Sequence, residues 1–236
     1  MTTSRKHGLA FVLIQTTILI SCQSQTIPVS FTGLSLDIPD GSSLGVVNMQ
    51  NVSGLTGSVG KLEVTISLLG TGSGGFNGDL YVSLVHDGAR SVLLNRPGKD
   101  ASDDFGYSDN GLQVTFADNA ANGDIHIYQN VVDPGGLSLT GTWQPDGRES
   151  DPALVTSSSS RTAFLSGFNS TARNGDWGLF VADLSPGGTV VLDSWSLRFQ
   201  AVPEPSQTGI VVAAGLTLMG IVRRLTTSPR ILGGKM

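Results

Sequence analysis

The sequence predicts an all-β protein in which short strands form a sandwich or a barrel. It holds 31 glycines and few aromatic (6%) or charged (14%) residues. Such a composition, with abundant Ser, Thr, Val and Asp, is typical of strands joined by many turns. Apolar residues alternate with period two in several short segments, and no stretch of the body carries an apolar stripe with the helical period of 3.6.

The N-terminal segment, residues 1–23, is predicted to be a signal peptide. Two basic residues precede the apolar run Leu9–Ile20, which has the usual length for the core of such a peptide. The letters LISC at Leu19–Cys22 resemble a bacterial lipobox, so lipidation of Cys22 is the alternative to ordinary cleavage. Cys22 is the only cysteine, and we therefore expect neither an internal disulfide nor a thiolate metal cage in the body.

Strand signals follow one another along the body. Four aliphatic residues of Val59–Gly70 fall on one face by alternation. Asp79–Asn95 is predicted to be a β-hairpin whose turn carries the letters HDGA. The other predicted strands are Leu44–Gly54, Gly111–Phe116, Asp176–Leu184 and Leu192–Phe199. Residues 117–160 are weakly patterned, and the TSSSSR stretch that follows Val155 is expected to be a surface loop.

The charge of the body excludes one class of partner. The whole chain has a formal charge of −5, but residues 24–200 contain eight basic and eighteen acidic residues, a charge of −10. Sixteen of these acids are Asp, which suits turns and cation-binding loops better than helices. We expect no nucleic acid partner, because so acidic a body cannot neutralise phosphates.

Four sequence landmarks stand in a recognisable order. They are IPDG at Ile38–Gly41, the Val64–Gly98 run with its Gly-Asp-Leu and Ser-x-Leu-Leu-x-Arg segments, VTFADNA at Val114–Ala120, and the ending Phe164–Phe199 with Ser-Trp-Ser-Leu. In these landmarks the chain resembles the P domain (Homo B domain) of subtilisin-like proprotein convertases. One departure is Gly175-Asp176-Trp177, where the family usually has Gly-Thr-Trp. The resemblance implies a jelly-roll-like β-sandwich over residues 34–200.

The P domain follows a serine endopeptidase in its family, but this sequence predicts no enzyme. A Ser-His-Asp protease needs a serine, a histidine base and an orienting acid. His7 falls in the signal segment, and we expect His86 and His126 to be surface or edge-strand side chains. Neither has a nucleophile elbow beside it in the sequence.

The resemblance also implies structural Ca²⁺, which P domains commonly hold. Ca²⁺ takes six to eight oxygen ligands from carboxylates and carbonyls in loops. The candidate ligands are Asp79, Asp118, Asp183 and Asp193. The alternative is that these aspartates cap turns, since their spacing matches no EF-hand or RTX repeat. A second cluster of acids lies at residues 100–104.

The C-terminal segment, residues 202–225, resembles a PEP-CTERM sorting signal. Its motif is Val202, Pro203, Glu204 and Pro205, and its basic cluster is Arg223 and Arg224. The predicted transmembrane helix covers about residues 208–222. Residues 206–222 carry no charge and would span about 25 Å as a helix, close to the thickness of a bilayer core. The resemblance implies an exosortase as the processing partner and a transient stay in the inner membrane. Twelve residues, 225–236, follow the arginines, a departure from the usual signal.

The preferred functional hypothesis is a non-catalytic exported protein, delivered to the cell surface or extracellular matrix for adhesion, matrix structure or partner binding. Its extracellular ligand, a polysaccharide or another molecule, is not identified by the sequence. One alternative is a carbohydrate-binding module, against which burial of Trp143, Trp177 and Trp195 would argue. Another is an accessory chain of a separate subtilisin-like serine protease, and a lipoprotein anchored at Cys22 is the alternative location.

Overall fold

The computed structural model describes residues 26–71 and 74–201, which are almost entirely strands and loops. Within these residues ten strands and three short 3₁₀ helices follow one another. The strands are β1 (Thr26–Phe31), β2 (Leu36–Ile38), β3 (Ser42–Val52), β4 (Val59–Thr71), β5 (Leu80–His86), β6 (Ala89–Asn95), β7 (Leu112–Phe116), β8 (Leu139–Trp143), β9 (Gly175–Asp183) and β10 (Thr189–Ala201). The helices are η1 (Asn77–Asp79), η2 (Ile125–Asn130) and η3 (Leu165–Phe168).

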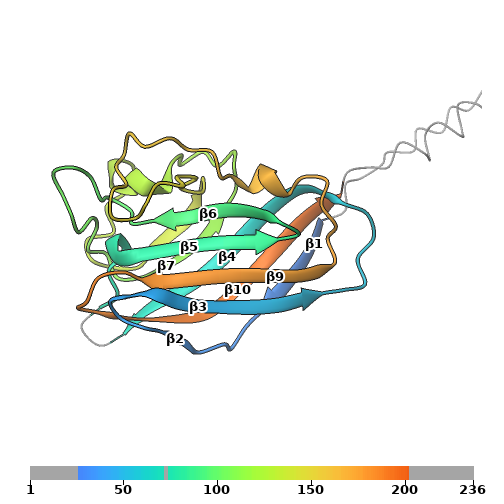
Figure 1. Ribbon diagram of the computed structural model, residues 1–236, viewed down its shortest axis with the longest axis horizontal. Helices are drawn as coiled ribbons and strands as arrows, with labels where there is room; N and C mark the ends of the chain where they lie inside the picture. The colour runs from blue at the N-terminus through green and yellow to red at the C-terminus, as the bar shows by residue number, and fades with distance from the viewer. Residues whose placement is uncertain (1–25, 72–73, 202–236) are drawn as a thin grey trace, which may run out of the picture.

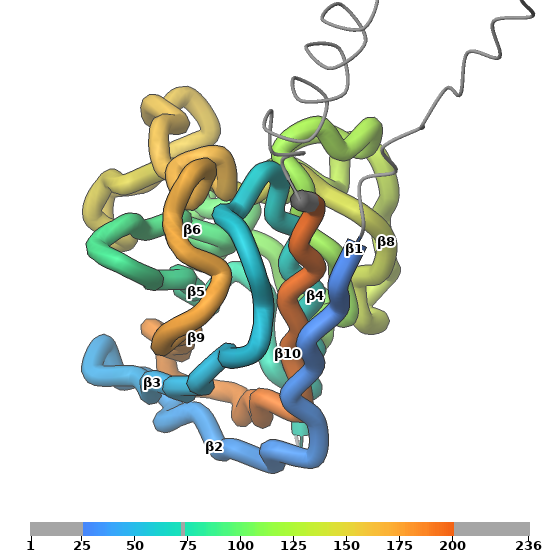
Figure 2. The backbone as a smooth tube through the Cα atoms, turned by 90° about the vertical axis from the view of Figure 1, so that its right-hand side faces the viewer, coloured from blue at the N-terminus to red at the C-terminus, as the bar shows by residue number. Residues whose placement is uncertain are grey.

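The described strands form two sheets that pack face to face. One sheet has the order β1-β10-β4-β7-β8, with β2 also paired to β10, and the other has the order β3-β9-β5-β6. Figure 1 shows the four-stranded sheet in front of the other, and Figure 2 shows the two layers side by side. The predicted all-β sandwich is confirmed.

The alternation read from β4 fixes which face of that strand enters the core. Leu62, Val64, Ile66 and Leu68 are all buried, with at most 2% of their surface exposed. The strand pairs with β10 on one side and β7 on the other, so it lies inside its sheet. Burying these four aliphatic side chains stabilises the fold by about 1.5–3 kcal/mol each.

The predicted hairpin of β5 and β6 is also confirmed. Its turn residues Asp87 and Gly88 have φ values of +49° and +77°. Positive φ at both central residues is the geometry of a type I′ turn, which matches the right-handed twist of paired strands. Asp-Gly is a favoured sequence for such a turn, because glycine adopts positive φ without strain.

The weakly patterned segment contains one strand that the sequence did not predict. β8 pairs in parallel with β7 at the end of the larger sheet. Only Leu139 and Trp143 at its ends are buried, whereas the three residues between them are exposed. An apolar alternation is therefore missing from β8.

The first sheet begins before the predicted domain boundary at residue 34. Thr26 of β1 pairs with Gln200 of β10, and Phe31 pairs with Trp195. The two ends of the described chain therefore leave the sandwich next to one another. No helix of the described ranges is long and apolar enough to cross a membrane. The predicted signal peptide and transmembrane helix lie outside those ranges.

Candidate functional site

Two of the four aspartates predicted as calcium ligands come together at one end of the sandwich. Asp79 precedes β5 and Asp183 ends β9, and in the pairing of these strands Leu80 lies opposite Asp183. The backbone N–H of Leu184 donates to the Asp79 carbonyl oxygen at 2.8 Å. Both aspartates are buried, with 6% and 1% of their surface exposed. The register of β5 and β9 therefore places two carboxyl groups close together inside the protein.

The other two predicted ligands have different partners. The Asp118 carboxylate accepts from the backbone N–H of Leu165 at 2.9 Å and of Ser166 at 2.7 Å, so it caps η3. Asp193 lies where the pairing of β10 with β4 shifts register, and it accepts from the Ser194 hydroxyl at 3.1 Å. Across residues 26–71 and 74–201, no group of three or more His, Cys, Asp and Glu side chains could hold a metal ion. The four aspartates are therefore not gathered in one place, and calcium binding by any of them stays a prediction.

Arg96 supplies positive charge beside Asp79. It follows β6 and has a φ of +51°, which is uncommon for a residue other than glycine. Its Nη2 lies 3.6 Å from Asp79 Oδ1 and donates to Ser185 Oγ at 3.1 Å. Its Nε donates to the Gly78 carbonyl oxygen at 3.0 Å. These contacts hold the buried guanidinium beside Asp79, and they offset the backbone strain at Arg96.

The two carboxyl groups carry more negative charge than Arg96 neutralises. Burial, the neighbouring Asp79 carboxylate and, less strongly, Asp40 raise the pKa of Asp183 to about 6. Burial also raises the pKa of Asp79, although the Ser185 hydroxyl and Arg96 oppose that rise. Asp183 Oδ1 is buried and accepts no hydrogen bond from any described residue. An additional positive group near this pair would therefore be stabilising.

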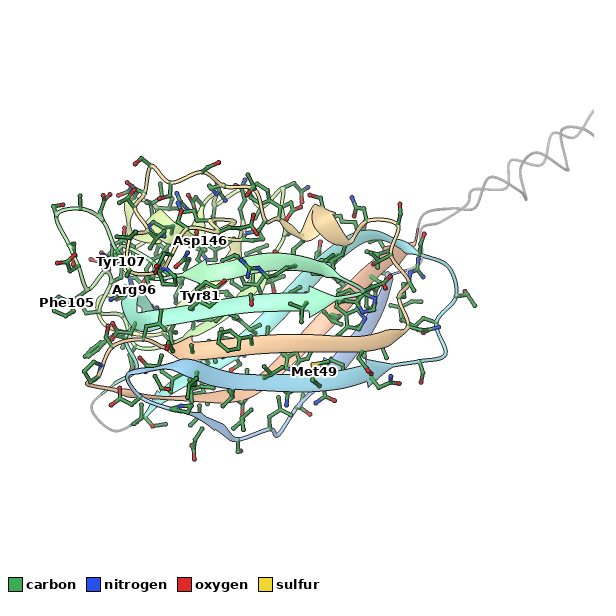
Figure 3. The ribbon with its side chains drawn as sticks, viewed as in Figure 1. Met49, Tyr81, Arg96, Phe105, Tyr107 and Asp146 are labelled. Atoms are coloured by element: carbon green, nitrogen blue, oxygen red, sulfur yellow. The ribbon has the colours of Figure 1, made fainter. Side chains whose placement is uncertain are left out.

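A pocket of about 210 Å³ opens against Asp79. Its walls include Phe76, Phe105, Tyr107 and Pro186. The Phe105 side chain is 74% exposed, which is unusual for a large aromatic residue. Figure 3 shows Phe105 and Tyr107 at the same end of the sandwich as Arg96. This pocket, with its acidic base and aromatic walls, is called the loop-end pocket below.

The loop that carries Phe105 is fixed by backbone contacts. Asp103 Oδ1 accepts from the N–H groups of Phe105 and Gly106, both at 3.0 Å, and closes a tight turn. The N–H of Gly78 donates to the Tyr107 carbonyl oxygen at 2.8 Å. A Cβ at Gly78 would collide with the Phe105 carbonyl oxygen, so this close approach requires glycine. The aromatic wall is thus held in place by the main chain.

The expectation that both histidines of the body lie on the surface or at a strand edge is wrong. His86 is 5% exposed and its ring stacks on Trp177, with 3.8 Å between ring centroids. Its Nδ1 contacts the Asp176 carbonyl oxygen at 2.9 Å, and its Nε2 contacts the Ala172 carbonyl oxygen at 2.7 Å. The hairpin turn suggested exposure, but the ring points inward from the last residue of β5.

His126 is also buried, with 0% of its surface exposed. Its Nδ1 lies 2.9 Å from Asp146 Oδ2, and its Nε2 lies 3.0 Å from the Lys99 carbonyl oxygen. The ring borders a second pocket of about 480 Å³, where the Ser157 hydroxyl donates to Asp100. Both ring nitrogens are already occupied, so His126 has no free nitrogen with which to activate a serine.

A further buried ion network supports the segment after β8. Arg148 Nη2 lies 2.8 Å from Asp124 Oδ2, and its Nη1 lies 3.2 Å from Asp146 Oδ1. Only 2% of Arg148 is exposed. Because the same Asp146 also contacts His126, this network joins η2 to the long loop that precedes η3.

The three tryptophans belong to the core. Trp143 and Trp177 are 0% exposed and Trp195 is 2% exposed. The indole N–H groups donate to Thr140, Arg173 and Asn48, respectively. None of the three presents a ring face to a sugar.

The remaining predicted site residues lie outside the described ranges. They are Cys22, the sorting motif Val202–Pro205, Arg223 and Arg224. Conversely, sequence reasoning assigned no role to Arg96 or Phe105. Arg96 stood within the Ser-x-Leu-Leu-x-Arg segment, and Phe105 was the one aromatic residue in an acidic loop sequence, GKDASDDF.

Comparisons with solved structures find distant neighbours, among them two serine protease structures. No protein-family model and no curated protein matches the sequence. A serine protease of Aeromonas sobria, solved in complex with the chaperone ORF2, is 16% identical over 76% of this chain and 27% of that chain, with a TM-score of 0.40. A second crystal structure, of the serine protease of Aeromonas sobria, is 16% identical over 75% of this chain and 26% of that chain, with a TM-score of 0.38. The chain spans about a quarter of the length of these proteins, and a likeness at this level gives neither activity nor partner.

Proposed function

We propose that this chain is an exported, non-catalytic binding protein with a P-domain-like sandwich, processed by an exosortase and delivered to the cell surface or extracellular matrix. Its role there is adhesion, matrix structure or partner binding. The export and sorting steps rest on the sequence of residues 1–23 and 202–225. The binding role rests on the sandwich and on its loop-end pocket.

The observation that supports a non-catalytic role most directly is the occupation of both histidine rings. Each ring nitrogen of His86 and His126 contacts a backbone carbonyl or a carboxylate at 2.7–3.0 Å. Both rings are buried and packed, and neither hydrogen-bonds to a serine within the described part of the chain. Such histidines stabilise a fold, whereas a general base needs a nitrogen that can reach substrate.

The test of export and sorting is intact-mass analysis of the protein from cells with and without their exosortase. We expect loss of the tail near Val202–Pro205 only when the exosortase is present. A tail that persists in normal cells would contradict the sorting proposal. A mass that fits a diacylated Cys22 would replace it with the lipoprotein alternative.

A second measurement tests the non-catalytic role. The purified full chain is incubated with denatured casein and with a panel of peptides, and we expect no hydrolysis above that of a buffer control. Cleavage that survives purification to constant activity and is lost on His126→Gln would contradict the proposal. A separate protease that co-purifies with the chain would instead favour the accessory role.

The buried tryptophans argue against the carbohydrate-binding alternative. Sugar-binding sites of β-sandwiches commonly use exposed aromatic rings, and Trp143, Trp177 and Trp195 are buried. The exposed aromatic residue of the loop end is Phe105, which lies beside acidic groups rather than on a flat sheet face. A site of that composition favours a cation over a neutral sugar.

A further inference from the structure

The loop-end pocket has an excess of negative charge at its base. Asp79 lines it, and Asp183 and Asp40 lie near enough to affect each other's ionisation, whereas Arg96 is the cation that contacts Asp79. Lys99, the basic residue of the loop that carries Phe105, is paired elsewhere, since its Nζ lies 3.2 Å from Asp104 Oδ1. The local charge therefore attracts a positively charged ligand.

Asp183, which neighbours Asp79, adds to this charge with an oxygen that lacks a hydrogen-bond donor. Its Oδ1 is buried, and no donor of residues 26–71 or 74–201 reaches it. Only 1% of the residue is exposed, so bulk water does not solvate the carboxylate fully. A buried carboxylate oxygen without a donor is costly, and a cation at Asp79 would lower that cost by electrostatic attraction.

The walls of the pocket indicate what kind of cation fits. Phe76, Phe105 and Tyr107 offer ring surface, and Pro186 adds an apolar contact. Aromatic rings attract ammonium and guanidinium groups and also pack against the methylene stem that carries them. A small inorganic cation would gain nothing from these rings, because it prefers a shell of six or more oxygens.

The size of the pocket limits the ligand further. Its volume of about 210 Å³ is below the roughly 300–1,000 Å³ of pockets that enclose drug-sized molecules. A single extended side chain suits this space, with its charged end at Asp79 and its stem between the rings. The 74% exposure of Phe105 leaves one ring face available to a partner.

We propose that the loop-end pocket binds the side chain of an arginine or lysine presented by an extended segment of a partner protein. This inference deepens the binding role proposed above and rests on it. Asp79 meets the charged group, Phe105 and Tyr107 flank its stem, and Arg96 holds Asp79 in position from the protein side.

The experiment is a calorimetric titration of the full chain, kept in mild detergent, with the peptide acetyl-Gly-Arg-Gly-amide. Peptides with lysine or citrulline in place of arginine are titrated in parallel, because citrulline keeps the length of arginine and removes its charge. We expect saturable binding of the arginine or lysine peptide and at least tenfold weaker binding of the citrulline peptide. Equal affinity for the arginine and citrulline peptides would overturn the proposal.

Two matched variants locate the binding. Phe105→Ala should weaken the binding of the basic peptide about five- to tenfold. This is the size expected when a bound cation loses contact with one aromatic ring. Leu154→Ala removes a side chain of similar exposure, 75%, from a loop that does not line the pocket, and should leave the affinity unchanged. Both side chains are largely exposed, so neither change should alter the melting temperature by more than a few degrees. An affinity that is insensitive to Phe105→Ala would place the peptide elsewhere and overturn the proposal.

Two further titrations separate this proposal from its competitors. Affinity for the basic peptide should rise from pH 5 to pH 7.5, because the carboxyl group of Asp183, whose pKa is raised to about 6 beside Asp79 and Asp40, then ionises. The raised pKa of Asp79, which Arg96 opposes, acts in the same direction. Ca²⁺ is titrated alone, and Ca²⁺ binding without peptide binding would overturn the proposal in favour of a metal site. The exosortase test is read from the mass of the tail, so either proposal can fail without affecting the result of the other.

Discussion

At the scale of single residues, Arg96 and Asp183 show how a local charge imbalance is built into a stable fold. Arg96 is fixed by Gly78, Ser185 and Asp79, with its guanidinium almost fully buried. Asp183 accepts no hydrogen bond from that guanidinium, and its Oδ1 has no donor among the described residues. The protein tolerates this arrangement by favouring the protonated form of the carboxyl group.

The raised pKa of Asp183 predicts the direction of a pH effect on stability. The folded-state pKa is about 6, against an ordinary value of 3.8, so the folded chain binds the proton more tightly than the unfolded chain. This stabilisation is complete below about pH 4 and is lost as the pH rises through about 6. For a shift of this size the loss is about 2–3 kcal/mol, and the raised pKa of Asp79 acts in the same direction.

The measurement compares unfolding by denaturant for the wild type and Asp183→Asn at pH 4 and pH 8. Asn cannot ionise, so we expect the variant to gain about 2 kcal/mol relative to the wild type between the two pH values. Asp87→Asn in the exposed hairpin turn is the control. If the difference between Asp183→Asn and the wild type is the same at both pH values, Asp183 does not titrate in this range.

At the scale of elements, short helices and loops are held by side chains from distant parts of the chain. The N–H groups that begin η3 donate to Asp118, which follows β7. The carboxylate thereby replaces the acceptors that the first turn of a helix lacks. This contact ties the segment before β9 to the larger sheet, since β7 belongs to that sheet.

We predict that Asp118→Ala destabilises the protein by about 1–2 kcal/mol, the usual cost of losing a helix cap. Thermal unfolding is measured in Ca²⁺ and in chelator. Because Asp118 binds backbone N–H groups, the loss should be equal in the two conditions. A loss that appears only in Ca²⁺ would show that Asp118 is a metal ligand after all.

The strands were predictable from the sequence where one face is buried. The alternation in β4 and the Asp-Gly turn after β5 are local signals, and both gave the correct structure. β8 was missed because its middle residues are exposed on both faces and it pairs in parallel with β7. β8 is a strand because it pairs with β7, and this pairing leaves no pattern in the sequence of β8 itself.

The candidate site was predictable only in part. Asp79 and Asp183 were both candidates, but their meeting depends on the register of β5 and β9, which joins residues more than a hundred positions apart. The inward direction of the His86 and His126 rings depends on carbonyl oxygens of remote loops. Long-range pairing of this kind leaves no periodic signal in the sequence.

At the scale of the whole molecule, one core extends between the two sheets and includes residues from both ends of the described chain. Val29 and Phe31 of β1 pack against this core, with 4.6 Å between the ring centroids of Phe31 and Trp195. β1 also covers one edge of β10, which would otherwise expose unpaired backbone groups.

We therefore predict that a chain beginning at residue 24 is more stable than one beginning at residue 34. Removing β1 uncovers Val29, Phe31 and the β10 edge, a loss of about 2–3 kcal/mol from apolar burial alone. For a protein of this size, the melting temperature should fall by roughly 5–10 °C. Equal melting temperatures would show that β1 contributes little to the folded state.

The pairing of Thr26 with Gln200 places the first and last described strand residues at the same end of the sandwich. Both chain ends leave from one end of the sandwich, whereas Arg96, Phe105 and Tyr107 lie at the other (Figures 1 and 3). A tether on either terminus, whether a lipid on Cys22 or an uncut tail, therefore gives the same outward presentation. For a chain tethered in this way, the length of the strands would set the height of the loop-end pocket above the anchoring surface.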